Sequence, residues 1–347
     1  MMNQIWIANV LLTRKCNLAC SYCNIVKNYE NMPEDYPKMA QHHSSEMKAT
    51  GWIDLVKRIT ANNPECFFIF YGGEPTLFKG LGKLLKYCNE NDVHYTVISN
   101  NTDIAKTKIY EIYDKIGPFK GFTSSVDPVA FLPGRTDDIA VKSRVGLDNL
   151  AIMKRDGIAE DVVAEITIMQ DSLPFLEQML VQLTEKGIYS SITAVDDQKT
   201  PFYDFSNVGS EVLIPRDENV RATFDRIIER AESGELLVHM PGLLNTLYDV
   251  LPSTMRCDLN EDVHNVSIEP NGNFRLCLRV RGINAAQLPY QQVISEDGEL
   301  SVQFVNAIQK DYIDYCKGCN WTCPIMSSKE FRTQIVDHDG STQSLEQ

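Results

Sequence analysis

The sequence predicts an α/β fold, a partial (β/α)6 TIM-like barrel followed by a small cysteine-rich C-terminal domain. Through the first 196 residues, short apolar segments alternate with amphipathic segments about six times, whereas the later sequence is polar and loop-rich. A strand followed by a helix, repeated in this way, is typical of a parallel sheet. Since six units are fewer than the eight that close a full barrel, we expect an open-sided barrel.

The apolar segments have the length of buried strands, and the segments between them have helical periodicity. The strands are predicted at residues 6–12, 67–71, 95–99, 121–126, 162–169 and 189–194. The helices are predicted at residues 45–60, 81–91, 104–116, 141–155 and 173–186. Several of these helices are followed by Gly or Asn, which is a common helix stop signal. Because active-site groups of such barrels lie where strands end and loops begin, the strand ends are where we expect a site.

Composition divides the chain into four parts. Residues 1–200 contain the barrel units, and residues 201–256 contain a polar linker and a charged helix expected at 217–233. Residues 257–336 hold five cysteines, and the polar residues 337–347 are predicted to form a flexible tail. The chain is therefore expected to have one large and one small domain.

Charge and hydropathy exclude several classes of protein. The 347 residues carry a formal net charge of −14 without a basic patch, so nucleic acid is not an expected partner. The first ten residues lack the basic region and cleavage site of a signal peptide, and no apolar run approaches the roughly 20 residues that span a bilayer. We therefore predict a cytoplasmic protein with no membrane partner.

Three cysteines follow the first predicted strand at a distinctive spacing. Cys16, Cys20 and Cys23 form a C-x3-C-x2-C pattern. In a cytoplasmic chain, clustered cysteines indicate metal ligands rather than disulfides. A four-iron four-sulfur cluster normally takes four thiolates, so three would leave one iron open to a small ligand. Zinc is the alternative, but a zinc site usually adds a nearby Cys or His pair, and His42 and His43 come only after a long polar loop.

This loop resembles the signature of the radical SAM enzymes, C-x3-C-x-aromatic-C, with Tyr22 as the aromatic residue. The resemblance implies that Cys16, Cys20 and Cys23 ligate a 4Fe-4S cluster whose open iron binds S-adenosylmethionine (SAM), and that Tyr22 lies near the adenine. It also implies an enzyme. An electron from the reduced cluster, supplied by a donor such as flavodoxin or ferredoxin, would cleave SAM to a 5′-deoxyadenosyl radical.

Two further motifs of that family follow the second and third predicted strands. Gly72, Gly73 and Glu74 resemble the GGE motif, whose backbone and acidic group receive the methionine ammonium of SAM. Glycines allow close approach of the main chain to a ligand, although an ordinary glycine turn is the alternative. Asn100 falls at the position expected to contact the ribose, and Asn101 replaces the usual glycine. Because Asn tolerates a left-handed backbone, we expect this turn to persist.

The fourth predicted strand ends in a similar motif. Ser125 and Asp127 match the family's Ser-x-Asp-Gly-Pro, although Pro128 follows Asp127 without the glycine. The resemblance implies that Ser125 contacts SAM. It also places Arg135 near the position of an arginine that pairs with the SAM carboxylate, with Arg144 as a competing candidate.

The last third of the chain contains Cys257, Cys277, Cys316, Cys319 and Cys323. Its C-x14-G-x4-C element resembles the opening of the SPASM and twitch domains, which bind auxiliary iron–sulfur clusters. Residues 266–278 are predicted to form a hairpin that positions Cys277. A full SPASM domain has seven or eight cysteines and two clusters, so five imply one auxiliary 4Fe-4S cluster. Cys257, Cys277, Cys316 and Cys319 are the preferred ligands and Cys323 is the fifth candidate, with a structural zinc as the alternative.

The resemblance thus implies a radical SAM oxidoreductase that abstracts a hydrogen atom from its substrate with help from an auxiliary cluster. Relatives of this kind modify ribosomal peptides or protein side chains, and others dehydrogenate sugars or cyclitols. A peptide substrate is the prediction, and a small-molecule dehydrogenase is the alternative. The first predicted strand begins within the first dozen residues, so no obvious peptide-recognition domain precedes it, although a leader peptide could dock on a sheet edge.

Overall fold

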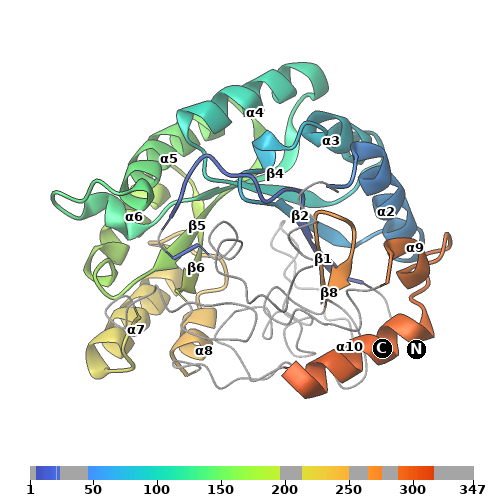
Figure 1. Cartoon of the computed structure of the whole chain (residues 1–347). Helices are drawn as coiled ribbons and strands as arrows, with labels where there is room; N and C mark the ends of the chain where they lie inside the picture. The colour runs from blue at the N-terminus through green and yellow to red at the C-terminus, as the bar shows by residue number, and fades with distance from the viewer. Residues whose placement is uncertain are drawn as a thin grey trace.

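The strands curl into a half-barrel with helices on its outer side (Figure 1). The structure, a computed structural model, describes residues 5–20, 22–23, 46–195, 213–249, 265–275 and 288–315. The five C-terminal cysteines predicted to bind an auxiliary cluster lie outside the described residues. No helix in the described ranges is long and apolar enough to cross a bilayer.

The described elements follow the predicted alternation closely. The strands are β1 (Ile7–Leu11), β2 (Phe67–Tyr71), β3 (Tyr95–Ser99), β4 (Phe119–Ser125), β5 (Ala159–Ile168), β6 (Tyr189–Ala194), β7 (Asn265–Ile268) and β8 (Phe274–Arg275). The helices are α2 (Ala49–Asn62), α3 (Leu81–Glu90), α4 (Asp103–Ile116), α5 (Asp138–Arg155), α6 (Leu176–Glu185), α7 (Glu218–Glu232), α8 (Leu243–Asp249), α9 (Tyr290–Val293) and α10 (Val302–Tyr315). The predicted partial α/β barrel is confirmed.

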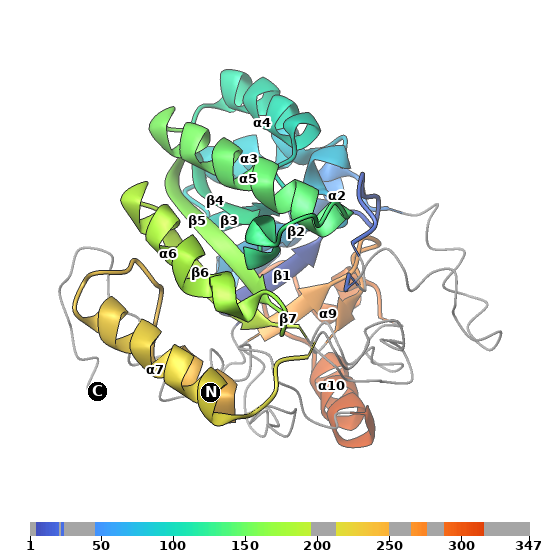
Figure 2. The same ribbon diagram turned by 90° about the vertical axis from the view of Figure 1, so that its left-hand side faces the viewer.

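The sheet order is β6-β5-β4-β3-β2-β1-β7-β8, with every neighbouring pair parallel except β7 and β8. β7 therefore adds a seventh parallel strand beside β1 (Figure 2), where six barrel strands were predicted. The Asn9 side chain donates a hydrogen bond to the Asn265 side chain at 2.7 Å across this pair. A hairpin was predicted at residues 266–278, and the structure describes it as far as residue 275. It continues the barrel sheet and covers the edge of β1, which would otherwise be unpaired on that side.

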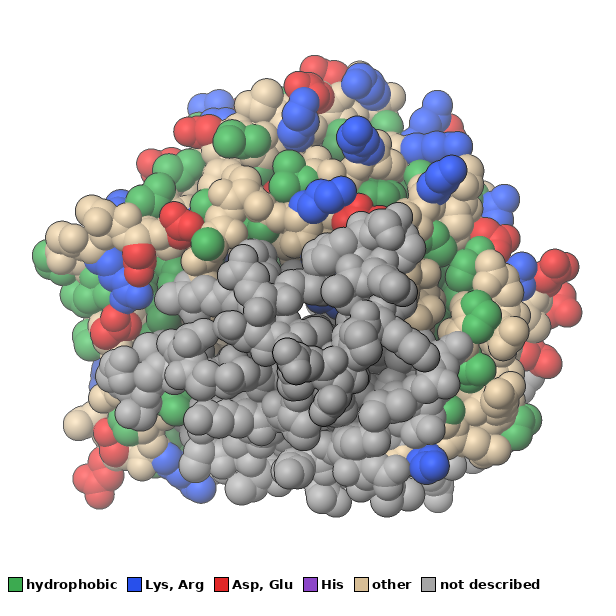
Figure 3. Space-filling view, viewed as in Figure 1, with side chains coloured by type: hydrophobic (Ala, Val, Ile, Leu, Met, Phe, Trp, Pro, Cys, Tyr) green, Lys and Arg blue, Asp and Glu red, His purple; other side chains and the backbone are tan. Residues whose placement is uncertain are grey.

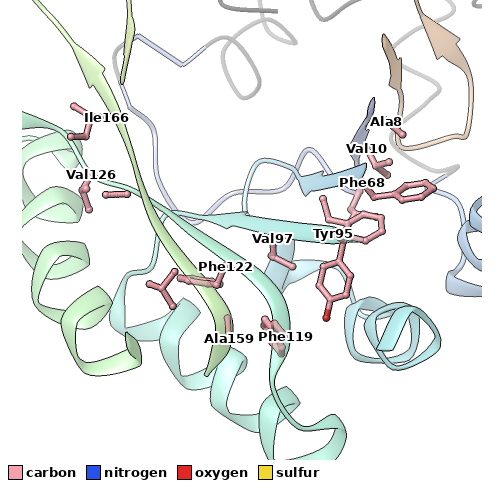
Figure 4. Packing of buried hydrophobic residues seen from close by; sticks show 14 of the residues in the cluster. Ala8, Val10, Phe68, Tyr95, Val97, Phe119, Phe122, Val126, Ala159 and Ile166 are labelled. Carbon is pink, nitrogen blue, oxygen red and sulfur yellow. The ribbon is translucent and has the colours of Figure 1, made fainter. Parts of the chain in front are cut away.

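The core lies between the sheet and the outer helices. Phe68 and Phe70 alternate along β2 with the more exposed Phe67, Ile69 and Tyr71, which face the interior of the half-barrel. On the helix side, Val97, Phe119 and Phe122 are fully buried, and Figure 4 shows them between strands and helices. The outer face of the sheet therefore packs against the helices, and the inner face is available for a functional site.

Local signals set several element ends. The Asp137 side chain accepts a hydrogen bond from the Ala140 N–H at the start of α5, and Asp217 does the same for Val220 at the start of α7. α4 ends at Ile116 and is capped by Gly117, whose φ of 78° is a conformation that glycine adopts readily. On the described surface that Figure 3 shows, acidic and basic side chains are interspersed.

Candidate functional site

The loop after β1 brings the three predicted cluster cysteines together. The Cys23 N–H donates to the Cys20 carbonyl at 3.1 Å, the Cys23 sulfur acts electrostatically on those of Cys16 and Cys20, and the Cys16 sulfur acts on that of Cys20. Burial raises the pKa of the Cys16 thiol, and it raises that of Cys20 to about 12. The metal-free thiols of Cys16 and Cys20 are therefore protonated at neutral pH, and a bound metal would remove their protons.

The ligand geometry bears on the choice between zinc and a cluster. Among the described residues, no group of three or more His, Cys, Asp or Glu side chains is arranged to hold a single metal ion. In an iron–sulfur cluster each thiolate binds a different iron, so the sulfurs need not converge on one point. The three thiols on one loop are therefore compatible with such a cluster.

The cysteine loop is held on the barrel by apolar packing and by the backbone. Cys20 packs in a cluster with Val129, Ile139 and Met169, which lie at the ends of β4 and β5 and on α5. The Ala19 N–H donates to the Asp138 carboxylate at 2.8 Å. The loop thus has a fixed position above the carboxyl ends of the strands.

Gly72 and Gly73 lie where β2 ends against the chain that leads into Cys16. A Cβ on Gly73 would come within 2.3 Å of the Lys15 carbonyl oxygen, and one on Gly72 within 2.7 Å of that of Thr13. The Gly73 N–H donates to the Thr13 carbonyl at 2.8 Å. The glycines are therefore required for close packing of β2 against the cysteine loop, and this packing explains them without a ligand.

Glu74 is buried, with 1% of its surface exposed. Its carboxylate accepts hydrogen bonds from the Thr76 N–H and hydroxyl, the Ser99 hydroxyl and the Asn100 N–H, at 2.8–3.1 Å. Burial raises the pKa of Glu74, and these hydrogen bonds offset part of that rise. The side chain thus joins the ends of β2 and β3, which is a structural role that the sequence motif did not indicate.

Asn100 lies beside the cysteine loop. Its amide nitrogen donates to the Asn17 side chain at 2.8 Å and lies 3.9 Å from the Cys16 sulfur. The predicted ribose contact stays a prediction, whereas a contact with the loop is observed. The next residue, Asn101, has a φ of 49°, which confirms the expected left-handed turn.

A second polar network in the site joins Tyr22, Ser125, Asp127 and Lys142. The Lys142 ammonium donates to the Tyr22 and Ser125 hydroxyl oxygens, each at 3.0 Å, and lies 3.1 Å from the Asp127 carboxylate. The Tyr22 hydroxyl donates to the same carboxylate at 2.6 Å, and the Thr167 N–H donates to its other oxygen at 2.9 Å. This network ties the cysteine loop to the ends of β4 and β5 and to α5.

Lys142 stays charged in this setting. Burial lowers its pKa, but Asp127, Tyr22 and Cys20 together raise it more, so the net shift is upward. Sequence reasoning missed this residue. Its signal is helical periodicity, because Lys142 lies on the buried face of α5 with Ile139, Ser143 and Gly146.

Arg135 and Arg144, the two predicted partners of the SAM carboxylate, have other neighbours. Arg135 forms ion pairs with Asp137 at 2.9 Å and with Asp171 at 2.5 Å. Arg144 donates to the backbone carbonyl of Arg135 at 2.9 Å. The cation that the structure places beside Ser125 is Lys142. The structure therefore brings Cys16, Cys20, Cys23, Tyr22, Gly72, Gly73, Glu74, Asn100 and Ser125 to the carboxyl edge of the sheet, and it places the Arg135 guanidinium in surface ion pairs.

Comparisons with known proteins agree with this geometry. Residues 10–129 match the model of the Radical SAM superfamily. SuiB of Streptococcus suis bound to S-adenosylmethionine has a similar structure, with a TM-score of 0.58 and 14% identity over 89% of this chain and 67% of SuiB. SuiB bound to the precursor peptide SuiA gives a TM-score of 0.57 and 15% identity over 94% of this chain and 74% of SuiB.

A third solved structure with a similar fold is that of anSMEcpe with bound AdoMet and the Cp18Cys peptide. Its TM-score is 0.55 at 15% identity, over 88% of this chain and 83% of that one. A search of curated proteins gave no match. At these identities the solved structures establish the fold, and the residues matched by the superfamily model include the cysteine loop and the motifs after β2 and β3. Residues 10–129 of the chain therefore form a radical SAM domain, and the protein is an enzyme.

Proposed function

We propose that the enzyme is a radical SAM oxidoreductase that modifies a side chain of a ribosomal peptide or protein. The observation that carries this proposal is the cysteine loop, fixed over the carboxyl ends of the strands by the Tyr22–Asp127–Lys142 network. The peptide substrate class is supported by the similar structures, since SuiB is bound to the precursor peptide SuiA and anSMEcpe to the Cp18Cys peptide.

Cys16, Cys20 and Cys23 would hold three irons of a 4Fe-4S cluster, and SAM would occupy the fourth. When bound, the cluster and SAM supply a 5′-deoxyadenosyl radical that removes a hydrogen atom from the substrate. Ser125 is suited to bind the SAM carboxylate. Its oxygen accepts a hydrogen bond from Lys142, so its own proton is available for donation.

Lys142 would support that contact indirectly. Its three N–H groups are directed to Tyr22, Ser125 and Asp127, so its part is to hold these groups and to supply positive charge near the carboxylate. Arg135 would then contribute to SAM binding only if it left its two ion pairs.

The auxiliary cluster belongs to the proposal as well. The β7–β8 hairpin, which leads toward Cys277, pairs with β1, the strand that leads into the cysteine loop. Arg14, just before Cys16, forms an ion pair with Glu269 in the hairpin, and the Met47 N–H donates to the Pro270 carbonyl at 2.7 Å. These contacts hold the hairpin beside the strand that leads into the cysteine loop. The spacing of the C-terminal cysteines supports a second 4Fe-4S cluster, held by four of Cys257, Cys277, Cys316, Cys319 and Cys323, that would act together with the radical site. A donor such as flavodoxin or ferredoxin would supply the electrons.

The substrate class is tested by mass spectrometry. The reconstituted enzyme is incubated anaerobically with SAM, a reductant and the peptide pool of a cell extract, and the variant lacking all three loop cysteines is the control. A mass change on a peptide that requires the loop cysteines supports the proposal. A change confined to a sugar or cyclitol in the unfractionated extract contradicts the peptide assignment and favours a small-molecule dehydrogenase.

The auxiliary cluster is tested by its metal content. Two four-iron clusters require about eight irons per chain, and about four should be lost when Cys257 and Cys277 are changed to Ala. The same variant should still cleave SAM but fail to complete turnover. Because metal binding and folding are coupled, circular dichroism serves as the folding control. About four irons in the unmutated protein, or zinc in place of the second cluster, would overturn this part of the proposal.

A further inference from the structure

One acidic side chain on the inner face of the half-barrel has no part in the site described above. Glu165 lies on β5, with Ser125 of β4 and Ser191 of β6 as its neighbours in register. Neighbours in register share one face of a sheet and lie roughly 4.8 Å apart between strands. Ala164 and Ile166, on either side of Glu165 in the chain, are fully buried. Glu165 therefore faces the interior, one strand away from a predicted SAM contact.

The surroundings of Glu165 make its charged form costly. Burial raises the pKa of its carboxyl to about 7, hydrogen bonding with Ser191 lowers it, and the negative charge of Asp127 raises it. Asp127 forms an ion pair with Lys142 and accepts a hydrogen bond from Tyr22. Lys142 is therefore not available to Glu165. Among the described residues, no cation forms an ion pair with Glu165.

Glu165 is nevertheless not fully enclosed. Glu165 is only half-buried, whereas its neighbours on the helix side of β5 have no exposed surface. A half-buried carboxyl that gains and loses a proton near neutral pH and faces the interior of a barrel is suited to exchange protons with a bound molecule. Asp161 lies on the same face of β5, four residues nearer the start of the strand, and provides a matched comparison.

We propose that Glu165 is a catalytic residue that contacts the substrate inside the half-barrel and accepts its proton. This inference rests on the proposed oxidoreductase function. Oxidation of a C–H centre that bears an O–H, N–H or S–H group removes one hydrogen atom, one electron and one proton. The radical takes the hydrogen atom, and an oxidised iron–sulfur centre of the proposed function takes the electron. The proton passes from the heteroatom to the Glu165 carboxylate: the heteroatom–H bond breaks, a carboxyl O–H bond forms, and a double bond from carbon to the heteroatom results.

A first experiment tests the carboxyl without any substrate. The whole protein is treated with a water-soluble carbodiimide and glycinamide, which modify accessible protonated carboxyls, and the modified residues are identified by peptide mass spectrometry. Glu165 should be modified at neutral pH, with a yield that falls as the pH rises through about 7. Absence of modification at every pH between 5 and 8 would overturn the proposal, because the carboxyl would then be unreachable.

A second experiment uses the peptide pool and compares Glu165→Gln, Glu165→Asp and the matched control Asp161→Asn. Glu165→Gln should still form 5′-deoxyadenosine in response to the pool, while modified peptide falls by about 10²–10⁴-fold. Glu165→Asp should restore part of the product, and Asp161→Asn should behave like the unmutated enzyme.

The pH dependence of product formation supplies a readout that a structural role would not change. The unmutated enzyme should gain product as the pH rises through about 7, and Glu165→Gln should lose that dependence. Unchanged product and an unchanged pH profile in Glu165→Gln would refute the catalytic role and leave the proposed function intact. An unmutated enzyme that modifies no peptide would refute the proposed function, and the inference on Glu165 would fall with it.

Discussion

Replacing Lys142 with Met should destabilise the protein strongly, because it removes the cation from a buried ion pair. The side chain of Lys142 is 5% exposed and that of Asp127 is fully buried, with 3.1 Å between the ammonium and the carboxylate. Removing one partner of a buried pair leaves an uncompensated charge and costs about 3–5 kcal/mol. This exceeds the roughly 0–1 kcal/mol expected for surface ion pairs such as those of Arg135.

The assay is equilibrium unfolding in urea at pH 7, compared between Lys142→Met and Lys154→Met. Lys154 is exposed on the same helix, so its replacement should change the free energy of unfolding by less than about 0.5 kcal/mol. The double variant Asp127→Asn with Lys142→Met should lose less stability than the two single variants summed, because the neutral pair no longer buries a charge. Equal, small effects of Lys142→Met and Lys154→Met would refute the importance of the network.

Three further changes test separate parts of the half-barrel. Gly73→Ala places a Cβ against the Lys15 carbonyl and should cost about 1–3 kcal/mol in urea unfolding and lower the bound iron, whereas Gly242→Ala, with open space at its Cβ, should do neither. Glu165→Gln should stabilise the protein by about 3 kcal/mol at pH 8 but only about 1 kcal/mol at pH 5. The reason is that folding raises the pKa of the Glu165 carboxyl, so the unmutated protein loses stability as the pH rises toward 7. A pH-independent difference in urea unfolding would contradict this. Arg135→Ala should leave SAM affinity unchanged by calorimetry, and a tenfold loss would restore Arg135 as a cofactor contact.

The barrel could be predicted because each of its units is encoded locally. Alternating exposure along β2 and β5 and helical periodicity in the segments between strands are properties of neighbouring residues. The seventh strand could not be predicted, because β7 pairs with a strand more than 250 residues earlier. That pairing depends on the open edge of β1, which becomes visible only after the other strands are in place.

The site was predicted in part, for a similar reason. The spacing of Cys16, Cys20 and Cys23 is local, and so is the left-handed turn at Asn101. The partners of a charged side chain, in contrast, are set by the tertiary structure. Lys142 reaches Asp127 only because α5 packs across the end of β4, and Glu74 is enclosed by donors from β3 that no spacing rule identifies.

The cleavage of SAM tests the central claim most directly. The reconstituted, chemically reduced protein should convert SAM to 5′-deoxyadenosine and methionine under anaerobic conditions, as measured by liquid chromatography with mass spectrometry. The variant with Cys16, Cys20 and Cys23 changed to Ala should form no 5′-deoxyadenosine and should retain the roughly four irons of the auxiliary cluster. Continued reductive cleavage of SAM by that variant would contradict the assignment of the loop as the radical SAM site.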